Sequence, residues 1–140
     1  MATLFTRIIE GEIPATFVLR DDRCVAFMSI NPLRRGHALV VPRVEIDRWV
    51  DCPPDLRDHL FAVCQDIGKA QQQAFQPTRV GLMIAGLEVP HLHIHLVPID
   101  VVHDLDFANA AASVERDDLE DAASSIRQIL LSKGVQGAVE

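Results

Sequence analysis

The chain has 140 residues, the length of one ordinary domain, and a hydrophobic fraction of 49%, enough to bury a sizeable core. Its formal charge of −7 argues against non-specific nucleic-acid binding, which requires a basic surface. No segment approaches the roughly 18 to 20 apolar residues of a membrane span, and the first residues lack a secretory pattern. We therefore expect one soluble, cytoplasmic domain over residues 1–140, with no nucleic-acid or membrane partner.

The first half of the chain predicts a short helix followed by three strands. Thr3 can cap the helix, an apolar stripe follows, and Gly11 with Pro14 ends it. Alternating and β-branched segments bounded by turn residues then predict strands over 16–20, 23–30 and 37–42, the first two forming a hairpin.

The second half predicts a long helix, two strands and a last helix. Apolar residues recur at helical spacing from Pro53 to Phe75. Residues 79–85 are typical of a buried strand, Gly86 of a turn, and 91–97 of another strand. Residues 101–113 show no clean period and predict a loop, and an amphipathic helix over 119–130 stops at Gly134. This order indicates an α+β fold with an antiparallel sheet of about five strands.

The three cysteines, Cys24, Cys52 and Cys64, are widely spaced and form no Cys-x-x-Cys pair. An odd number without that spacing indicates neither a disulfide framework nor a zinc knuckle. We expect three unpaired thiols in the core or on the surface.

Half of the six histidines fall at alternate positions in one segment, at His91, His93 and His95. On a strand they would share one face, with aliphatic residues on the other. Metal binding is one interpretation, but residues 91 and 95 of a straight strand lie roughly 13 Å apart, whereas zinc–nitrogen bonds measure about 2.0 to 2.1 Å. Two histidines could share an ion, with Glu88 as the nearest acidic companion. A surface patch would not explain the strict alternation.

Covalent catalysis is the interpretation that needs no metal. Neutral imidazole is a nucleophile, and its unperturbed pKa near 6.5 leaves a usable neutral fraction at neutral pH. A neighbouring histidine can stabilise charge on a phosphoryl oxygen or assist a leaving group. His93 is the favoured attacking residue because it alone has a histidine on both sides.

The segment from His91 to Val97 resembles the histidine triad pattern, His-φ-His-φ-His-φ-φ with φ apolar, at every position. The segments "LFTRIIEGEIPA", "VAFMSINP" and "GHALVVP" are similar to the opening helix, second strand and third strand of the histidine triad (HIT) family. The last of these carries His37 at the position of an upstream family histidine. The resemblance covers roughly residues 4–98, and 99–140 would form a C-terminal loop and helix.

The resemblance implies a HIT-like domain and a nucleotide hydrolase or transferase that acts on a nucleoside phosphoramidate or a (di)nucleoside polyphosphate. His93 would attack the α-phosphorus to form a covalent nucleotidyl-histidine, His91 and His95 would position and stabilise the phosphate, and His37 would complete the cluster. It also implies a homodimer and no metal or other cofactor in the chemistry. The base and ribose pocket of the family maps onto Leu4, Phe5, Ile8, Phe27, Met28, Ser29 and Ile30.

Three departures from the family pattern bear on the site. Thr3 and Thr6 replace the Cys-x-x-Cys pair that many members use for a structural zinc, so we expect no such zinc. Ser29 stands where many members have an acid that grips the ribose hydroxyls. Glu88 replaces a neutral phosphate-side residue, and its carboxylate would repel a bound phosphate unless it were protonated or paired.

Two further function classes compete with the enzyme that forms a nucleotidyl-His93. One is a nucleotide-binding module with little turnover, in which Leu87 and Glu88 have altered the phosphate loop. The other is a metal-dependent hydrolase using His91, His93 and either Glu88 or His37.

Overall fold

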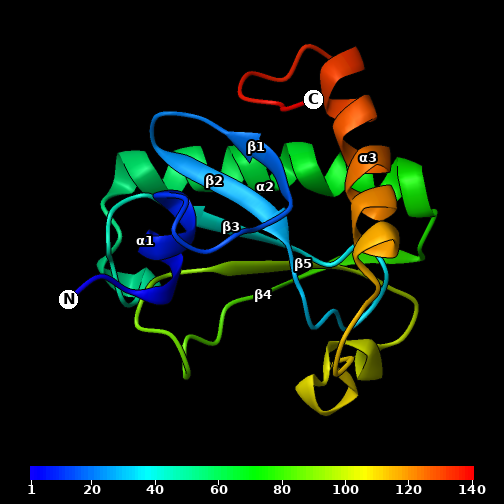
Figure 1. The fold of residues 1–140 in the computed structure, drawn as a ribbon, viewed down its shortest axis with the longest axis horizontal. Coiled ribbons are helices and arrows are strands. Elements are labelled where there is room, and N and C mark those ends of the chain that lie inside the picture. The colour runs from blue at the N-terminus through cyan, green and yellow to red at the C-terminus, as the bar shows by residue number, and fades with distance from the viewer.

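The computed structural model describes all 140 residues and consists of a five-stranded antiparallel sheet with three α-helices (Figure 1). The order of strands across the sheet is β1-β2-β3-β5-β4. Both the α+β class and the helix positions expected from the sequence are confirmed. The strands are β1 Phe17–Arg20, β2 Cys24–Met28, β3 Ala38–Pro42, β4 Arg79–Met83 and β5 Ile94–Ile99; the helices are α1 Leu4–Ile9, α2 Pro54–Phe75 and α3 Arg116–Ser132.

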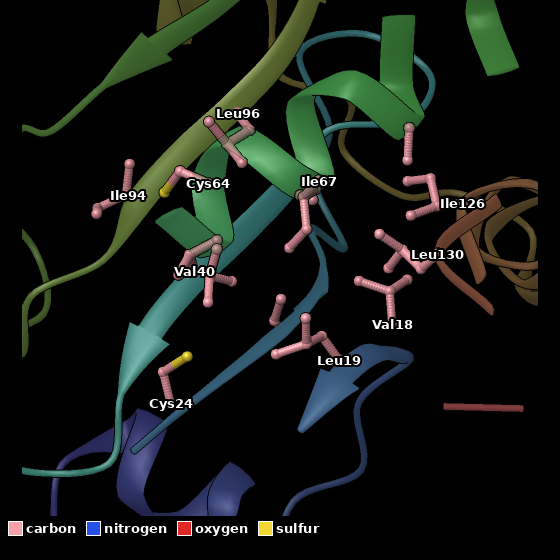
Figure 2. Packing of buried hydrophobic residues seen from close by; sticks show 14 of the residues in the cluster. Val18, Leu19, Cys24, Val40, Cys64, Ile67, Ile94, Leu96, Ile126 and Leu130 are labelled. Atoms are coloured by element: carbon pink, nitrogen blue, oxygen red, sulfur yellow. The ribbon is translucent and has the colours of Figure 1, made fainter. Parts of the chain in front are cut away.

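One face of the sheet is covered by α2 and α3; in Figure 1 α2 crosses behind the strands, and α3 stands at the right of the view in front of the end of α2. Alternate residues of the inner strands point into this interface, so a cluster of 20 buried residues forms between the layers (Figure 2). Cys24 and Cys64 belong to this cluster, and all three cysteines are unpaired. Leu19, Val40, Ile67, Leu96, Ile126 and Leu130 are among the other members.

The opposite face packs against α1 and holds a smaller apolar cluster of seven buried residues. Phe5 from α1, Phe27 from β2 and Leu39 from β3 belong to it. His95 on β5 pairs in register with Leu39, and its neighbours Ile94 and Leu96 point to the larger core. Strand alternation therefore directs His95 to the face that α1 partly covers.

Two strand predictions need correction. The segment from Arg79 is an edge strand with partly exposed residues, not a buried one, because β4 pairs only with β5. β5 begins at Ile94, so His91 and His93 precede the strand. The ladder ends there because its last pair joins Val40 to Ile94. The distance argument based on a straight strand over 91–97 therefore does not apply.

The segment predicted as a loop over residues 101–113 contains two short 3₁₀-helices, η2 Val102–Leu105 and η3 Phe107–Asn109. Arg34 pairs with Asp104, and the Asn31 side chain donates hydrogen bonds to the carbonyls of residues 111 and 112. These contacts hold the segment against the turn that follows β2. No helix of the chain has the length and apolar character required to cross a bilayer.

Candidate active site

Four histidines meet at the α1 face of the sheet, although they come from different kinds of backbone. His95 lies in β5, His37 immediately precedes β3, and His91 and His93 lie in the irregular segment before β5. All four are buried, with His93 and His95 each 8% exposed. The ring centroids of these two lie 5.1 Å apart, and those of His37 and His95 lie 5.2 Å apart. The structure thus brings together the three triad residues and the upstream histidine.

Hydrogen bonds determine where the proton of His95 lies. The backbone N–H of Leu33 donates to Nδ1 of His37 at 3.0 Å, so the proton of neutral His37 is on Nε2. That Nε2 lies 2.9 Å from Nδ1 of His95 and donates to it. Nδ1 of His95 is therefore an acceptor, and its Nε2 carries an N–H.

His93 has the opposite arrangement. Its Nδ1 lies 2.8 Å from the backbone carbonyl of His91, which can only accept, so Nδ1 carries the proton. In neutral His93 the lone pair is then on Nε2, the nitrogen with no partner within the protein. Two adjacent rings thus offer complementary groups: a lone pair on His93 and an N–H donor on His95.

Both ring nitrogens of His91 are occupied by the protein. Nε2 lies 2.7 Å from the carbonyl of Pro42 at the end of β3, and Nδ1 lies 2.7 Å from the Thr3 hydroxyl before α1. The carbonyl requires an N–H, so Nδ1 accepts the hydroxyl proton. His91 therefore has no free nitrogen for a ligand and instead joins the triad segment to β3 and α1.

Three of the buried histidines, His37, His91 and His95, are held in the neutral state. Burial, with His95 close by, lowers the pKa of His37 to about 3. Burial and the neighbouring His93 lower the pKa of His95 to about 4. Burial also lowers the pKa of His91, although the bond to Pro42 and the charge of Glu45 oppose the shift. Near neutral pH, the three rings keep the hydrogen-bond arrangement described above.

Several predicted pocket residues surround the cluster. The Phe5 ring makes edge contacts with His93, at a centroid distance of 4.9 Å, and with His91, at 5.8 Å. Phe27 packs on Phe5 at 5.8 Å, and Ile8 completes this apolar wall.

Of the other predicted pocket residues, Ser29 adjoins His37, because its backbone N–H donates to the His37 carbonyl at 3.0 Å. Leu4 and Ile30 are exposed, and Ser29 accepts a weak hydrogen bond from the backbone of Asn31 at 3.3 Å. Met28 belongs to the larger core, and together with His37 it lines a pocket beside the turn that follows β2.

Glu88 lies in the exposed bend before the triad and makes no hydrogen bond or ion pair. The structure therefore does not bring its carboxylate into contact with any of the four histidines.

Thr3 and Thr6 do not offer the donor set of a structural zinc site. The Thr3 hydroxyl lies 2.7 Å from His91, and the Thr6 hydroxyl donates to Glu45 at 2.6 Å. Zinc in structural sites is bound by thiolates, imidazoles and carboxylates, and neutral hydroxyls already engaged with protein groups are poor substitutes. The residues present do not fit that metal.

Two residues at the site escape prediction from the sequence. The Phe107 ring packs edge-on against His95, with 5.2 Å between the ring centroids. The one signal for it in the sequence is that segment 101–113 contains no other Phe, Tyr or Trp. Glu45 follows β3 in a stretch with no motif, and no signal in the sequence links it to the triad.

Comparison with known proteins identifies the family. Residues 10–101 match the HIT domain. An uncharacterised HIT-like protein of Methanocaldococcus jannaschii is 35% identical over 99 residues, which cover 68% of this chain and 77% of that protein. The adenosine 5'-monophosphoramidase of Saccharomyces cerevisiae is 30% identical over 98 residues, or 69% of this chain and 62% of the enzyme. The crystal structure of a Bartonella henselae HIT-like protein superposes with a TM-score of 0.81 at 29% identity, covering 91% of this chain and 96% of that one. The chain belongs to the HIT family.

Proposed function

We propose that this protein is a nucleotide hydrolase that attacks the α-phosphorus of a nucleoside phosphoramidate through His93. The observation that carries the proposal is the hydrogen bond from Nδ1 of His93 to the His91 carbonyl. It leaves Nε2 as an unpartnered lone pair, and a nucleophile requires a lone pair directed at the reacting atom.

His95 supports this role because its free Nε2–H lies beside the nucleophile. An N–H donor stabilises charge that develops on a phosphoryl oxygen or on the departing group. His37 acts one step further away, since its own Nε2–H fixes which nitrogen of His95 is protonated. His91 touches no substrate in this proposal and instead orients His93.

The reaction takes two displacements at phosphorus. In the first, Nε2 of His93 forms a bond to the α-phosphorus as the bond from phosphorus to the leaving nitrogen breaks. The departing nitrogen takes a proton from solvent water and leaves as an amine, while the Nε2–H of neutral His95 donates a hydrogen bond to a phosphoryl oxygen. In the second, water attacks phosphorus, the bond to His93 breaks, and a nucleoside monophosphate and two protons are released, one of which neutralises the hydroxide left by the first displacement.

The site and the named relative both support this substrate class. A histidine nucleophile suits a phosphorus centre with a nitrogen leaving group, and the yeast relative is named as an adenosine 5'-monophosphoramidase. The apolar wall of Phe5, Ile8 and Phe27 supports a flat nucleobase next to His93. Ser29 offers a neutral hydroxyl to the ribose.

The arrangement argues against a catalytic metal bound by the triad. Of the four imidazoles, only His93 and His95 have a ring nitrogen free of protein partners, and Glu88 contacts neither. Catalytic zinc sites have three protein ligands. One group of side chains does place its ligand atoms within 4.8 Å of one another: Asp21, Cys24 and His59. None of these residues belongs to the triad.

Trapping the intermediate tests the proposal. Wild-type protein mixed with adenosine 5'-phosphoramidate and quenched in base, because phosphohistidine is acid-labile, should carry an adenylyl group on His93 by peptide mass spectrometry. His93→Ala should show no adduct and lose turnover by at least about a thousandfold. His103→Ala, an exposed histidine outside the cluster, is the matched control and should behave as wild type. If the wild type bound nucleotide but showed neither adduct nor turnover, the protein would be a nucleotide-binding module and not a hydrolase.

We also infer a homodimer, supported by the free edge of β4. This strand pairs only with β5 and leaves its other edge open, where a second copy can add a strand. Light scattering after size-exclusion chromatography should give twice the chain mass.

A further inference from the structure

We propose that Glu45 is a positioning residue for His93 and acts through Thr3 and His91. This inference rests on the proposed function, since it concerns the orientation of the same nucleophile. Glu45 lies in the loop after β3 and reaches back to the start of α1. Together with Thr3, Thr6 and His91 it forms a hydrogen-bonded group that we call the N-terminal clamp.

Glu45 forms hydrogen bonds with the N-cap and the first turn of α1. One carboxylate oxygen accepts a hydrogen bond from the Thr6 hydroxyl at 2.6 Å and another from the Thr3 backbone N–H at 2.9 Å. The Thr3 hydroxyl oxygen in turn caps the helix by accepting from the Thr6 backbone N–H at 3.1 Å. These three bonds place the Thr3 hydroxyl at a defined point beside His91.

The same bonds direct the proton of the Thr3 hydroxyl. It has two possible acceptors: Nδ1 of His91 at 2.7 Å and the Thr6 hydroxyl oxygen at 3.2 Å. His91 has its own proton on Nε2, facing the Pro42 carbonyl, so its Nδ1 needs a donor. The shorter separation and this need both favour a bond from Thr3 to His91. Both ring nitrogens of His91 are then held.

Fixing His91 fixes the nucleophile, because the His91 carbonyl is the acceptor for Nδ1 of His93. The neighbouring Leu92 N–H donates to the Ile46 carbonyl at 2.6 Å. The loop around Glu45 therefore holds the triad segment through side chain and backbone together. If the clamp is lost, the His91 carbonyl can shift, and the lone pair of His93 is no longer confined to one nitrogen or one direction.

The clamp contains Thr3 and Thr6, which occupy the positions where many members of the family have the zinc-binding Cys-x-x-Cys pair. The Thr6 hydroxyl and the Thr3 backbone N–H donate to the Glu45 carboxylate, and the Thr3 hydroxyl bonds to His91, so these bonds link α1 to the triad segment in this chain. We infer that positioning of His93 here depends on Glu45.

Three variants test the proposal. Glu45→Ala removes both bonds to α1, whereas Glu45→Gln keeps an amide oxygen that can accept them. Asp47→Ala, two residues away on the same exposed loop, is the control. With adenosine 5'-phosphoramidate we expect kcat of Glu45→Ala to fall roughly tenfold with KM little changed. Glu45→Gln and Asp47→Ala should stay within about twofold of wild type. An unchanged kcat in Glu45→Ala, or an equal loss in Glu45→Gln, would overturn the proposal.

A second measurement separates this proposal from the proposed function. Ring ¹⁵N chemical shifts distinguish the two neutral tautomers of His93 and need no turnover. Wild type should show a single Nδ1–H form, and Glu45→Ala a mixture; one identical form in both would contradict the proposal even in an active enzyme. Absence of turnover in wild type would count against the function alone. If Glu45→Ala fails to fold, Thr3→Val and Thr3→Ser test the next hydrogen bond of the clamp, from the Thr3 hydroxyl to His91. The fall in kcat is expected in Thr3→Val, which lacks the hydroxyl, and not in Thr3→Ser, which keeps it.

Discussion

The two faces of the sheet are built from the same strands but do different work. The face under α2 and α3 buries a cluster of 20 residues with no histidine among them. The face under α1 buries only seven apolar residues and places four histidines beside them. Strand alternation makes this division possible, because consecutive residues such as His95 and Leu96 belong to opposite faces. The first face provides stability, and the second combines weaker packing with groups that carry protons.

The largest effect should come from opening a cavity in the larger core. Leu60→Ala truncates a buried side chain of α2, and such changes typically cost about 2 to 5 kcal/mol of unfolding free energy. Urea unfolding measures the loss, with the exposed neighbour Phe61→Ala as control. Turnover per folded molecule should be nearly unchanged, since Leu60 contacts the other face of the sheet. A large fall in kcat would show that the two faces are not separable.

Acid should weaken the fold through the histidine face. The pKa values of His37 and His95 are lowered to about 3 and about 4, whereas the unfolded chain protonates these groups near 6.5. Below pH 6.5 the unfolded state binds more protons, so stability falls as pH drops, and the effect ends near pH 4 for His95 and near pH 3 for His37. Each group contributes about 1.4 kcal/mol per pH unit within its window.

Urea midpoints at pH 7, 6 and 5 measure this slope. His37→Gln should remove about one group's share of it, and His103→Gln, which changes an exposed histidine, should not alter it. An equal slope in all three proteins would contradict the assignment of the acid sensitivity to the buried cluster.

Phe5→Leu should affect both properties modestly. It keeps an apolar side chain in the smaller cluster but removes the ring edges against His93 and Phe27. Aromatic pairs of this kind contribute about 0.5 to 1.5 kcal/mol each beyond burial. We expect a loss of about 1 kcal/mol together with a several-fold fall in kcat/KM, whereas Leu4→Ala on the exposed side of α1 should change little. A loss of stability without any effect on turnover would place Phe5 outside the substrate pocket.

Glu88→Gln should have the smallest effect. Through water, two unit charges roughly 10 Å apart interact by about 0.4 kcal/mol. Removing the exposed carboxylate before the triad should therefore lower KM for an anionic nucleotide by about twofold without altering kcat. The difference should shrink at high salt, and Asp117→Asn on α3 should leave KM as in wild type. A large fall in kcat would instead indicate that Glu88 takes part in the chemistry.

The fold could largely be predicted from the sequence because its signals are local. Apolar periodicity locates α2 and α3, a capping threonine marks the start of α1, and turn residues separate the strands. The exposure of β4 could not be predicted, since an apolar segment does not show whether a second strand will pair with it. The start of β5 also depends on where β3 ends, which is a property of the partner strand.

The sequence by itself determined the histidines of the site and singled out His93 by its place between the other two. The tertiary structure decided which nitrogen of each ring is free, because the deciding partners are the Leu33 N–H, the Pro42 carbonyl and the Thr3 hydroxyl. The first two are backbone groups, which have no signature in a sequence, and the Thr3 side chain lies 88 positions from His91 with no pattern that pairs them. The direction of these groups is set only when β3, the loop that contains Glu45 and the start of α1 meet around the triad.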